Sequence, residues 1–330
     1  MQLLKGYSVD KLIEIKDVSK FFETKDFFGR KKNTTKAVDG VSFVINRGET
    51  FGLVGESGCG KSTLGRTLIR MNEPTDGQIL YEGKDISHLK GKELKEYHKK
   101  MQIIFQDPYS SLDPNLTVKD IIAEPIKVFE NISNEELEER ISNLLESVGL
   151  QPEDMYKYSY EFSGGQRQRV GIARALSVNP QFVLCDEPIS ALDVSIQAQV
   201  INLLEELQEK KGLTYLFVAH DLNMVHHISD KIGVMYLGKL VEVGTSDEIY
   251  YHPKHPYTKA LLSAIPNIEK DKRLDLDKEI IEGDIPSPFD VPKGCRFHPR
   301  CPYACEGCKH IEPSLEEIGD NHYVACNFPL

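Results

Sequence analysis

A glycine-rich segment at residues 55–62 carries the clearest chemical signal in the sequence. It reads Gly-Glu-Ser-Gly-Cys-Gly-Lys-Ser, which fits the pattern G-x4-G-K-[ST] of a phosphate-binding loop. An apolar strand is predicted before it and a helix after it, which is the context that the pattern requires. Because Gly55, Gly58 and Gly60 allow a tight turn, successive backbone N–H groups can point at phosphate oxygens. We therefore predict a nucleotide phosphate site here.

The residues that close this loop add a charge and a metal ligand. Lys61 supplies a cation for the β- and γ-phosphates, and the start of the following helix supplies its dipole. Ser62 is suited to ligate Mg²⁺. The same predicted site includes Ser57, Cys59 and Thr63.

Two carboxylates follow an apolar run at 182–185. A buried strand that ends in Asp186 and Glu187 would place both groups at its carboxyl end, where open α/β sheets bind ligands. Phosphoryl transfer needs neutralised charge and an aligned nucleophile. We therefore predict that Asp186 holds Mg²⁺ through water and that Glu187 polarises the attacking water.

The predicted elements that position these groups alternate between strands and helices. Helical spacing of apolar residues predicts helices over 133–148, from about 166 to 176, and from Asp193 to just before Gly212. A strand is predicted at 214–219. This alternation is typical of an α/β fold with a mainly parallel sheet covered on both faces.

Composition limits the function. The chain has 330 residues, 40 Lys and Arg against 51 Asp and Glu, and a formal net charge of −11, which argues against a nucleic-acid-binding protein. Apolar runs have strand length, and the first residues do not resemble a secretory signal, so a location inside the cell is expected. Length alone predicts two domains.

Cysteines are concentrated near the C-terminus. Five of the seven lie between Cys295 and Cys326, and in a reducing compartment such crowding favours metal or cluster binding over disulfides. The C-x2-C pair Cys305/Cys308, with histidines nearby, suits zinc, and Cys301-Pro302 is similar to the Cys-Pro of ferredoxins. Spacing leaves zinc and an iron–sulfur cluster open, with free thiols as a further alternative.

A second glycine motif precedes the predicted helix at 166–176. It consists of Ser163, Gly164, Gly165 and Gln166, and two glycines at a helix start form another anion-binding nest. If the two nests lie on different faces, only two subunits packed head to tail can bring both to one ATP. Here the sequence resembles the ATP-binding-cassette (ABC) family, whose signature motif is Ser-Gly-Gly-Gln.

Further residues match the motifs of this family in order. The resemblance implies that Phe22 stacks on adenine and that Gln106 senses Mg²⁺ and the γ-phosphate. It also implies that Asp193 belongs to the D-loop and that His220 contacts the γ-phosphate. The implied activity is ATP hydrolysis with Mg²⁺.

The resemblance covers essentially the whole chain and implies a P-loop NTPase fold of the α/β class. The ABC cassette, at 1–255, would contain a RecA-like core, an antiparallel β subdomain and a helical subdomain at about 107–178. A small Cys-rich extension would follow at 256–330.

Within the family the sequence is similar to the F-type ATPase of oligopeptide and dipeptide importers. The segments that are similar to the importer branch are 107–114, 185–195 and 255–262. The segments 171–176 and 185–188 and the insertion before Ala37 are similar to its F-type member. The resemblance implies a related D-type ATPase as heterodimer partner and two transmembrane permease subunits. An external solute-binding protein would be an indirect partner. The chain would then lie peripherally at the cytoplasmic face of the cell membrane. A nickel or oligosaccharide importer ATPase, and a soluble ABC ATPase, are the alternatives.

The cysteine-rich extension also resembles that of peptide-importer ATPases. That resemblance implies a [4Fe–4S] cluster, with zinc as the alternative, and the ligands Cys295, Cys301, Cys308 and Cys326. Cys305 is a possible substitute ligand.

Overall fold

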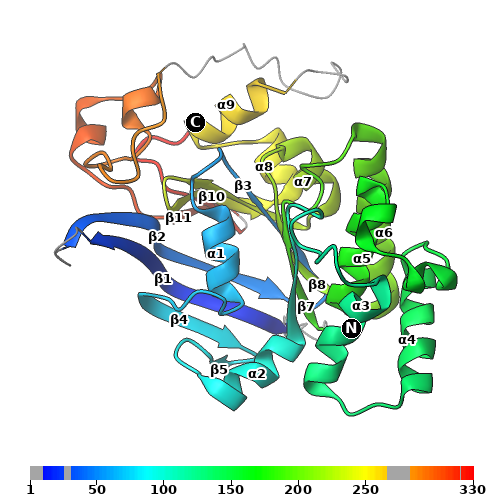
Figure 1. The fold of residues 1–330 in the computed structure, drawn as a ribbon. Helices are drawn as coiled ribbons and strands as arrows, with labels where there is room; N and C mark the ends of the chain where they lie inside the picture. The colour runs from blue at the N-terminus through cyan, green and yellow to red at the C-terminus, as the bar shows by residue number, and fades with distance from the viewer. Residues whose placement is uncertain (1–9, 26–30, 266–282, 320) are drawn as a thin grey trace, which may run out of the picture.

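The computed structural model describes residues 10–25, 31–265, 283–319 and 321–330, which form two sheets with helices around them (Figure 1). The first sheet has the strand order β2-β1-β4-β5 and is antiparallel throughout. Its strands are β1 (Lys11–Lys25), β2 (Lys31–Asn46), β4 (Asp76–Tyr81) and β5 (Lys84–Asp85). The antiparallel β subdomain implied by the family resemblance is therefore present.

The second sheet has eight strands in the order β11-β12-β10-β9-β3-β8-β7-β6. The five strands from β9 to β6 are parallel, as predicted, whereas β10, β12 and β11 are antiparallel at the other edge. The strands are β3 (Thr50–Val54), β6 (Met101–Ile104), β7 (Phe182–Asp186), β8 (Thr214–Val218), β9 (Lys231–Tyr236), β10 (Lys239–Thr245), β11 (Glu316–Gly319) and β12 (His322–Val324).

Helix α1 (Lys61–Leu68) lies between the two sheets and contacts both (Figure 1). Gly65 allows this close packing, because a Cβ added there would lie 2.6 Å from a methyl group of Leu184 in β7. The buried face of α1, the inner face of the first sheet and one face of the second sheet form a continuous apolar core. The helix that follows the glycine-rich loop is thus held firmly.

The opposite face of the second sheet is covered by helices (Figure 1). The range predicted for the helical subdomain, about 107–178, contains α3 (Val118–Phe129), α4 (Asn134–Ser147) and α5 (Gly164–Leu176), which pack on one another. The 3-10 turns η1 (Pro152–Tyr156) and η2 (Ser159–Glu161) lie between α4 and α5 in the chain. Helix α5 begins two residues earlier than predicted, because Ser163 is its N-cap. Helix α6 (Val194–Lys211) ends at Gly212 in the left-handed conformation, as predicted.

The C-terminal extension adds strands to the second sheet. Strand β12 pairs with β10 through Glu242 and Val324, and β11 pairs with β12. The remaining elements are α2 (Gly91–Lys100), α7 (Leu222–Ile228), α8 (Ser246–Tyr251), α9 (Pro256–Ser263), η3 (His298–Arg300) and η4 (Glu306–Lys309). None of the helices in the described part of the chain has the length and apolar character of a membrane span.

Candidate nucleotide-binding site

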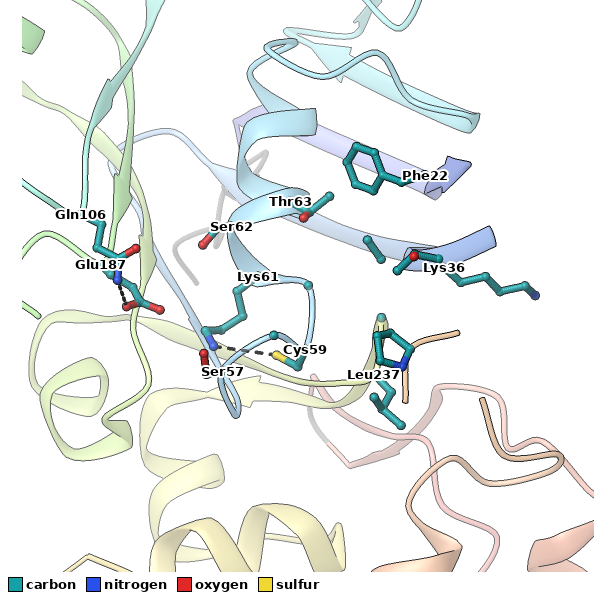
Figure 2. Close-up of a pocket in the computed structure, with 16 residues that line it drawn as sticks. Phe22, Lys36, Ser57, Cys59, Lys61, Ser62, Thr63, Gln106, Glu187 and Leu237 are labelled. Atoms are coloured by element: carbon teal, nitrogen blue, oxygen red, sulfur yellow. Dashed lines mark hydrogen bonds between the residues drawn. The ribbon is translucent and has the colours of Figure 1, made fainter. Parts of the chain in front are cut away.

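A cleft of about 380 Å³ lies in front of the glycine-rich loop (Figure 2). Its walls come from the loop and the start of α1, from strands β1 and β2, and from residues that follow β6, β7 and β9. The lining residues are Phe22, Thr35, Lys36, Ala37, Ser57, Gly58, Cys59, Gly60, Lys61, Ser62, Thr63, Gln106, Glu187, Leu237, Gly238 and Pro288. The structure therefore brings most of the predicted nucleotide-binding residues to one cleft.

Two glycines of the loop are required by their surroundings. Gly60, the N-cap of α1, has φ of 111°, and a Cβ there would lie 2.0 Å from the carbonyl oxygen of Ala37. Gly55 has φ of 151°, and its Cβ would lie 2.1 Å from the carbonyl oxygen of Met235. A side chain at either position would clash with backbone, so the loop conformation depends on glycine.

Lys61 is almost fully buried, and its ammonium group bridges the loop. The Nζ atom donates hydrogen bonds to the carbonyl oxygens of Gly55, at 2.6 Å, and Glu56, at 3.0 Å. A cation held this way at the start of α1 reinforces the positive end of the helix dipole. Ser62 and Thr63 line the cleft beside it (Figure 2). This end of the cleft is suited to anionic oxygens.

Asp186 is fully buried at the end of β7. Its Oδ2 atom accepts a hydrogen bond from Arg66 Nε at 3.1 Å and lies 3.0 Å from Arg66 Nη2. Its Oδ1 atom is buried and has no hydrogen-bond partner among the described residues. An unsatisfied carboxylate oxygen is costly, and a water bound to Mg²⁺ would satisfy it. The geometry of Asp186 therefore fits the predicted metal role.

Glu187 and Gln106 meet at the inner end of the cleft. Gln106 Nε2 donates a hydrogen bond to Glu187 Oε2 at 2.8 Å (Figure 2). Glu187 has φ of 49°, an uncommon conformation for a residue other than glycine, which often marks functional sites. A second hollow of about 480 Å³ is lined by Ser57, Gln106, Asp107, Glu187, Ser190, Ala191 and His220. His220 thus shares a hollow with Glu187, as their predicted roles require.

Phe22, in β1 of the first sheet, lines the cleft at the end opposite Gln106 and Glu187 (Figure 2). The residue is 42% exposed, and Lys20 Nζ lies 5.1 Å from the centroid of its ring. The neighbouring Phe21 does not line the cleft. Of the two adjacent aromatic residues, Phe22 is thus the one with a face available for stacking on a base.

The predicted signature residues lie outside both hollows. Ser163 and Gln166 form a capping box at the start of α5, in which Gln166 N donates to Ser163 Oγ and Ser163 N donates to Gln166 Oε1. Ser163 and Gln166 are exposed, and Gly164 and Gly165 are half-buried. Asp193, the N-cap residue of α6, is also exposed. The signature residues at the start of α5 therefore do not line the cleft that the glycine-rich loop lines.

Several residues at the site were not predicted from the sequence. Arg66 contacts Asp186, Arg300 contacts Glu56, and Pro288 lines the cleft. The first two contacts join residues 120 and 244 positions apart. Only the three-dimensional structure could reveal them.

The C-terminal cysteines lie close enough to affect one another electrostatically. Burial, together with the neighbouring Cys295, Cys326 and Cys308, raises the pKa of Cys301 to about 11. Cys305 is exposed, with its Sγ atom 3.6 Å from that of Cys308. Within the described residues, no group of three or more His, Cys, Asp or Glu side chains has an arrangement that could hold a metal ion. The predicted cluster therefore remains a prediction.

A P-loop, an acidic strand end and a separate signature helix, on a RecA-like sheet with an antiparallel subdomain, define an ABC-type ATPase. The sequence profile of the ABC transporter family matches residues 38–190, and that of the oligopeptide/dipeptide transporter C-terminal region matches residues 241–308. The solved dimeric cassette MJ0796, bound to ADP and Pi, aligns with a TM-score of 0.64 at 29% identity, over 71% of this chain and 98% of that one.

The chain belongs to the ATP-binding proteins of the oligopeptide/dipeptide branch of the ABC transporter family. It is 52% identical to the oligopeptide transport ATP-binding protein AppF of Bacillus subtilis, over 96% of this chain and 97% of that one. It is 48% identical to the oligopeptide transport ATP-binding protein OppF of Salmonella typhimurium, over 96% and 95%. The family and the F-type resemblance predicted from the sequence are confirmed.

Proposed function

We propose that this chain is the ATP-hydrolysing subunit of a peptide importer. The observation that carries the proposal is the single cleft in which the glycine-rich loop, Lys61 and Glu187 meet. Relatives named as oligopeptide transport proteins support peptide as the cargo over nickel or oligosaccharide, and over a soluble ATPase without transport.

In the proposed mechanism the loop amides and Lys61 bind the phosphates, and Phe22 stacks on adenine. Ser62, Gln106 and Asp186 would hold Mg²⁺, which neutralises phosphate charge when bound. Glu187 accepts a proton from the attacking water, and His220 contacts the γ-phosphate. Catalysis is therefore mostly positioning and electrostatic stabilisation.

A second ATPase subunit is needed to complete each site. The signature residues Ser163 to Gln166 and the D-loop residue Asp193 line neither hollow of this chain's own site, and Ser163, Gln166 and Asp193 are exposed. In a dimer, these residues would contact the ATP that is bound by the partner subunit. We infer a heterodimer with a related D-type ATPase, bound to two permease subunits at the cytoplasmic face of the membrane, with an external binding protein delivering the solute.

Reconstitution tests the cargo and the partners together. The chain is co-expressed with a D-type ATPase and two permeases, and ATPase activity and uptake are measured in proteoliposomes with the binding protein. Oligopeptides should stimulate both, whereas Ni²⁺ and oligosaccharides should not. Stimulation by Ni²⁺ or sugar alone would reject the peptide assignment, and full activity without permeases would reject coupling to transport.

We also propose that Cys295, Cys301, Cys308 and Cys326 bind a [4Fe–4S] cluster, with zinc as the alternative. The proposal is supported by the proximity of these thiols, since each of Cys295, Cys301 and Cys326 has other members of the set among the groups that act on it electrostatically. Anaerobic purification with metal analysis separates the possibilities. A cluster is expected to give iron, sulfide and absorbance near 400 nm. A zinc site is expected to give one zinc ion per chain and no such absorbance. A purified protein that contains neither iron nor zinc would reject the proposal.

A further inference from the structure

A buried arginine of the C-terminal extension contacts the phosphate loop. Arg300, at the end of η3, donates from Nη1 to Glu56 Oε2 at 2.7 Å and from Nη2 to Glu56 Oε1 at 2.9 Å. The side chain of Arg300 is only 6% exposed, and that of Glu56 is 22% exposed. A two-bond fork between a guanidinium and a carboxylate fixes distance and orientation together.

Glu56 is the second residue of the loop, and its backbone is held as well. Its N–H donates to the hydroxyl oxygen of Tyr257 in α9 at 2.9 Å, and its carbonyl oxygen accepts from Lys61 Nζ at 3.0 Å. Arg300 holds the side chain of the same residue. Three groups therefore converge on Glu56, and two of them come from the C-terminal part of the chain.

Arg300 is not a wall of either hollow that surrounds the catalytic residues. It therefore has no direct path to a bound phosphate. Arg300 also donates from Nη1 to the hydroxyl oxygen of Tyr236 at 3.4 Å, but of these two partners only Glu56 belongs to the loop. Its effect on a nucleotide is therefore expected to pass through Glu56. The loop binds phosphate through backbone N–H groups, whose directions depend on the position of the backbone.

We propose that Arg300 is a positioning residue for ATP binding, which holds the phosphate loop in its binding conformation through the carboxylate of Glu56. Without these two hydrogen bonds, part of the free energy of ATP binding is used to order the loop, so ATP binds more weakly. Once ATP is bound, Glu187 and His220 are unaffected. The expected signature is a raised KM with little change in kcat.

The test uses the full-length chain and a fluorescent ATP analogue with Mg²⁺. Arg300→Met and Glu56→Gln should each weaken binding about tenfold. If Arg300 acts through Glu56, the double variant should be no more than about twofold weaker than the weaker single variant. Lys309→Met is the matched control, because it removes an extension cation whose partner, Glu306, is on the exposed surface. It should stay within about twofold of the wild type.

A conservative variant and a kinetic measurement complete the test. Arg300→Lys keeps the charge but not the fork, so its affinity should lie between those of wild type and Arg300→Met. In the assembled transporter, Arg300→Met should raise KM with kcat within about twofold of wild type. Wild-type affinity in both single variants, additive losses in the double variant, or a loss confined to kcat would overturn the proposal. If Arg300→Met does not fold, Glu56→Gln decides alone, and unchanged affinity overturns it.

Discussion

Gln106 and Glu187 are joined by a hydrogen bond of 2.8 Å across the inner end of the nucleotide cleft. They follow β6 and β7, which pair in parallel, so the bond links the ends of two neighbouring strands. Gln106 directly precedes segment 107–116, where we expect a permease subunit to dock and where Tyr109, Ser110 and residues 113–115 are exposed. A movement of that segment can therefore reach the carboxylate that is proposed to activate water.

The role of Glu187 predicts the behaviour of Glu187→Gln. The amide keeps the size of the side chain and can still bond to Gln106, but it cannot accept a proton from water. ATP hydrolysis should fall by about a hundredfold or more, while ATP binding is retained. Size-exclusion chromatography with ATP and the partner ATPase should reveal a trapped closed dimer. Normal turnover in this variant would refute the assigned role.

Docking at segment 107–116 predicts that Tyr109 matters for transport. Tyr109 is 56% exposed, and the guanidinium of Arg167 lies 4.2 Å from its ring centroid. Tyr109→Ala should lower peptide uptake about tenfold, because exposed aromatic residues often carry interface energy, and lower basal ATPase less than about twofold. The control is Tyr156→Ala, at another exposed tyrosine. Equal loss of uptake and ATPase in Tyr109→Ala would contradict docking there.

The buried carboxylate of Asp186 predicts a specific response to metal removal. Chelation of Mg²⁺ by EDTA should weaken ATP binding by the wild type about tenfold. Asp186→Asn should bind ATP weakly with Mg²⁺ and lose little more with EDTA. Its partner Arg66 is 41% exposed, so water can solvate the unpaired cation. Calorimetric titration measures both affinities.

A matched control exists for that experiment. Asp247 is 81% exposed and pairs with His226 on α7. Asp247→Asn should respond to EDTA as the wild type does. If Asp186→Asn also responds like the wild type, Asp186 has no part in holding the metal.

The nucleotide motifs could be predicted because each one is local. In the loop at 55–62, the positive φ of Gly55, Gly58 and Gly60 and the helix start at Lys61 are properties of adjacent residues. Likewise, four apolar residues before Asp186 are enough to indicate a buried strand. The parallel order of the central strands then brings the carboxyl ends together.

Contacts between distant segments could not be predicted in the same way. The three-residue strand β12 is too short to show a pattern, yet it pairs with β10. Buried Glu242 accepts hydrogen bonds from the backbone N–H groups of Lys254 and His255, and its carboxylate lies 2.8 Å from His322 Nε2. The sequence around a charged residue in an apolar strand does not indicate which distant residues form hydrogen bonds with it.

The buried His255 predicts a pH dependence of stability. This residue is 1% exposed, and burial lowers its pKa from 6.5 to about 3. Its Nδ1 atom accepts a hydrogen bond from Tyr257 N at the start of α9. The folded state therefore keeps the ring neutral, whereas the unfolded state takes up a proton below about pH 6.5. The stabilisation is complete above that pH and is lost as pH falls toward 3.

The variant His255→Asn isolates this effect, because an asparagine oxygen can still cap α9 but does not titrate. Between pH 7.5 and 5.5 the wild type should lose about 1.4 kcal/mol more stability than His255→Asn, since one pKa unit corresponds to that free energy. Urea unfolding at each pH measures the two slopes. All other titrating groups are common to both proteins and cancel in the comparison. Parallel pH profiles would mean that His255 is not held neutral by burial.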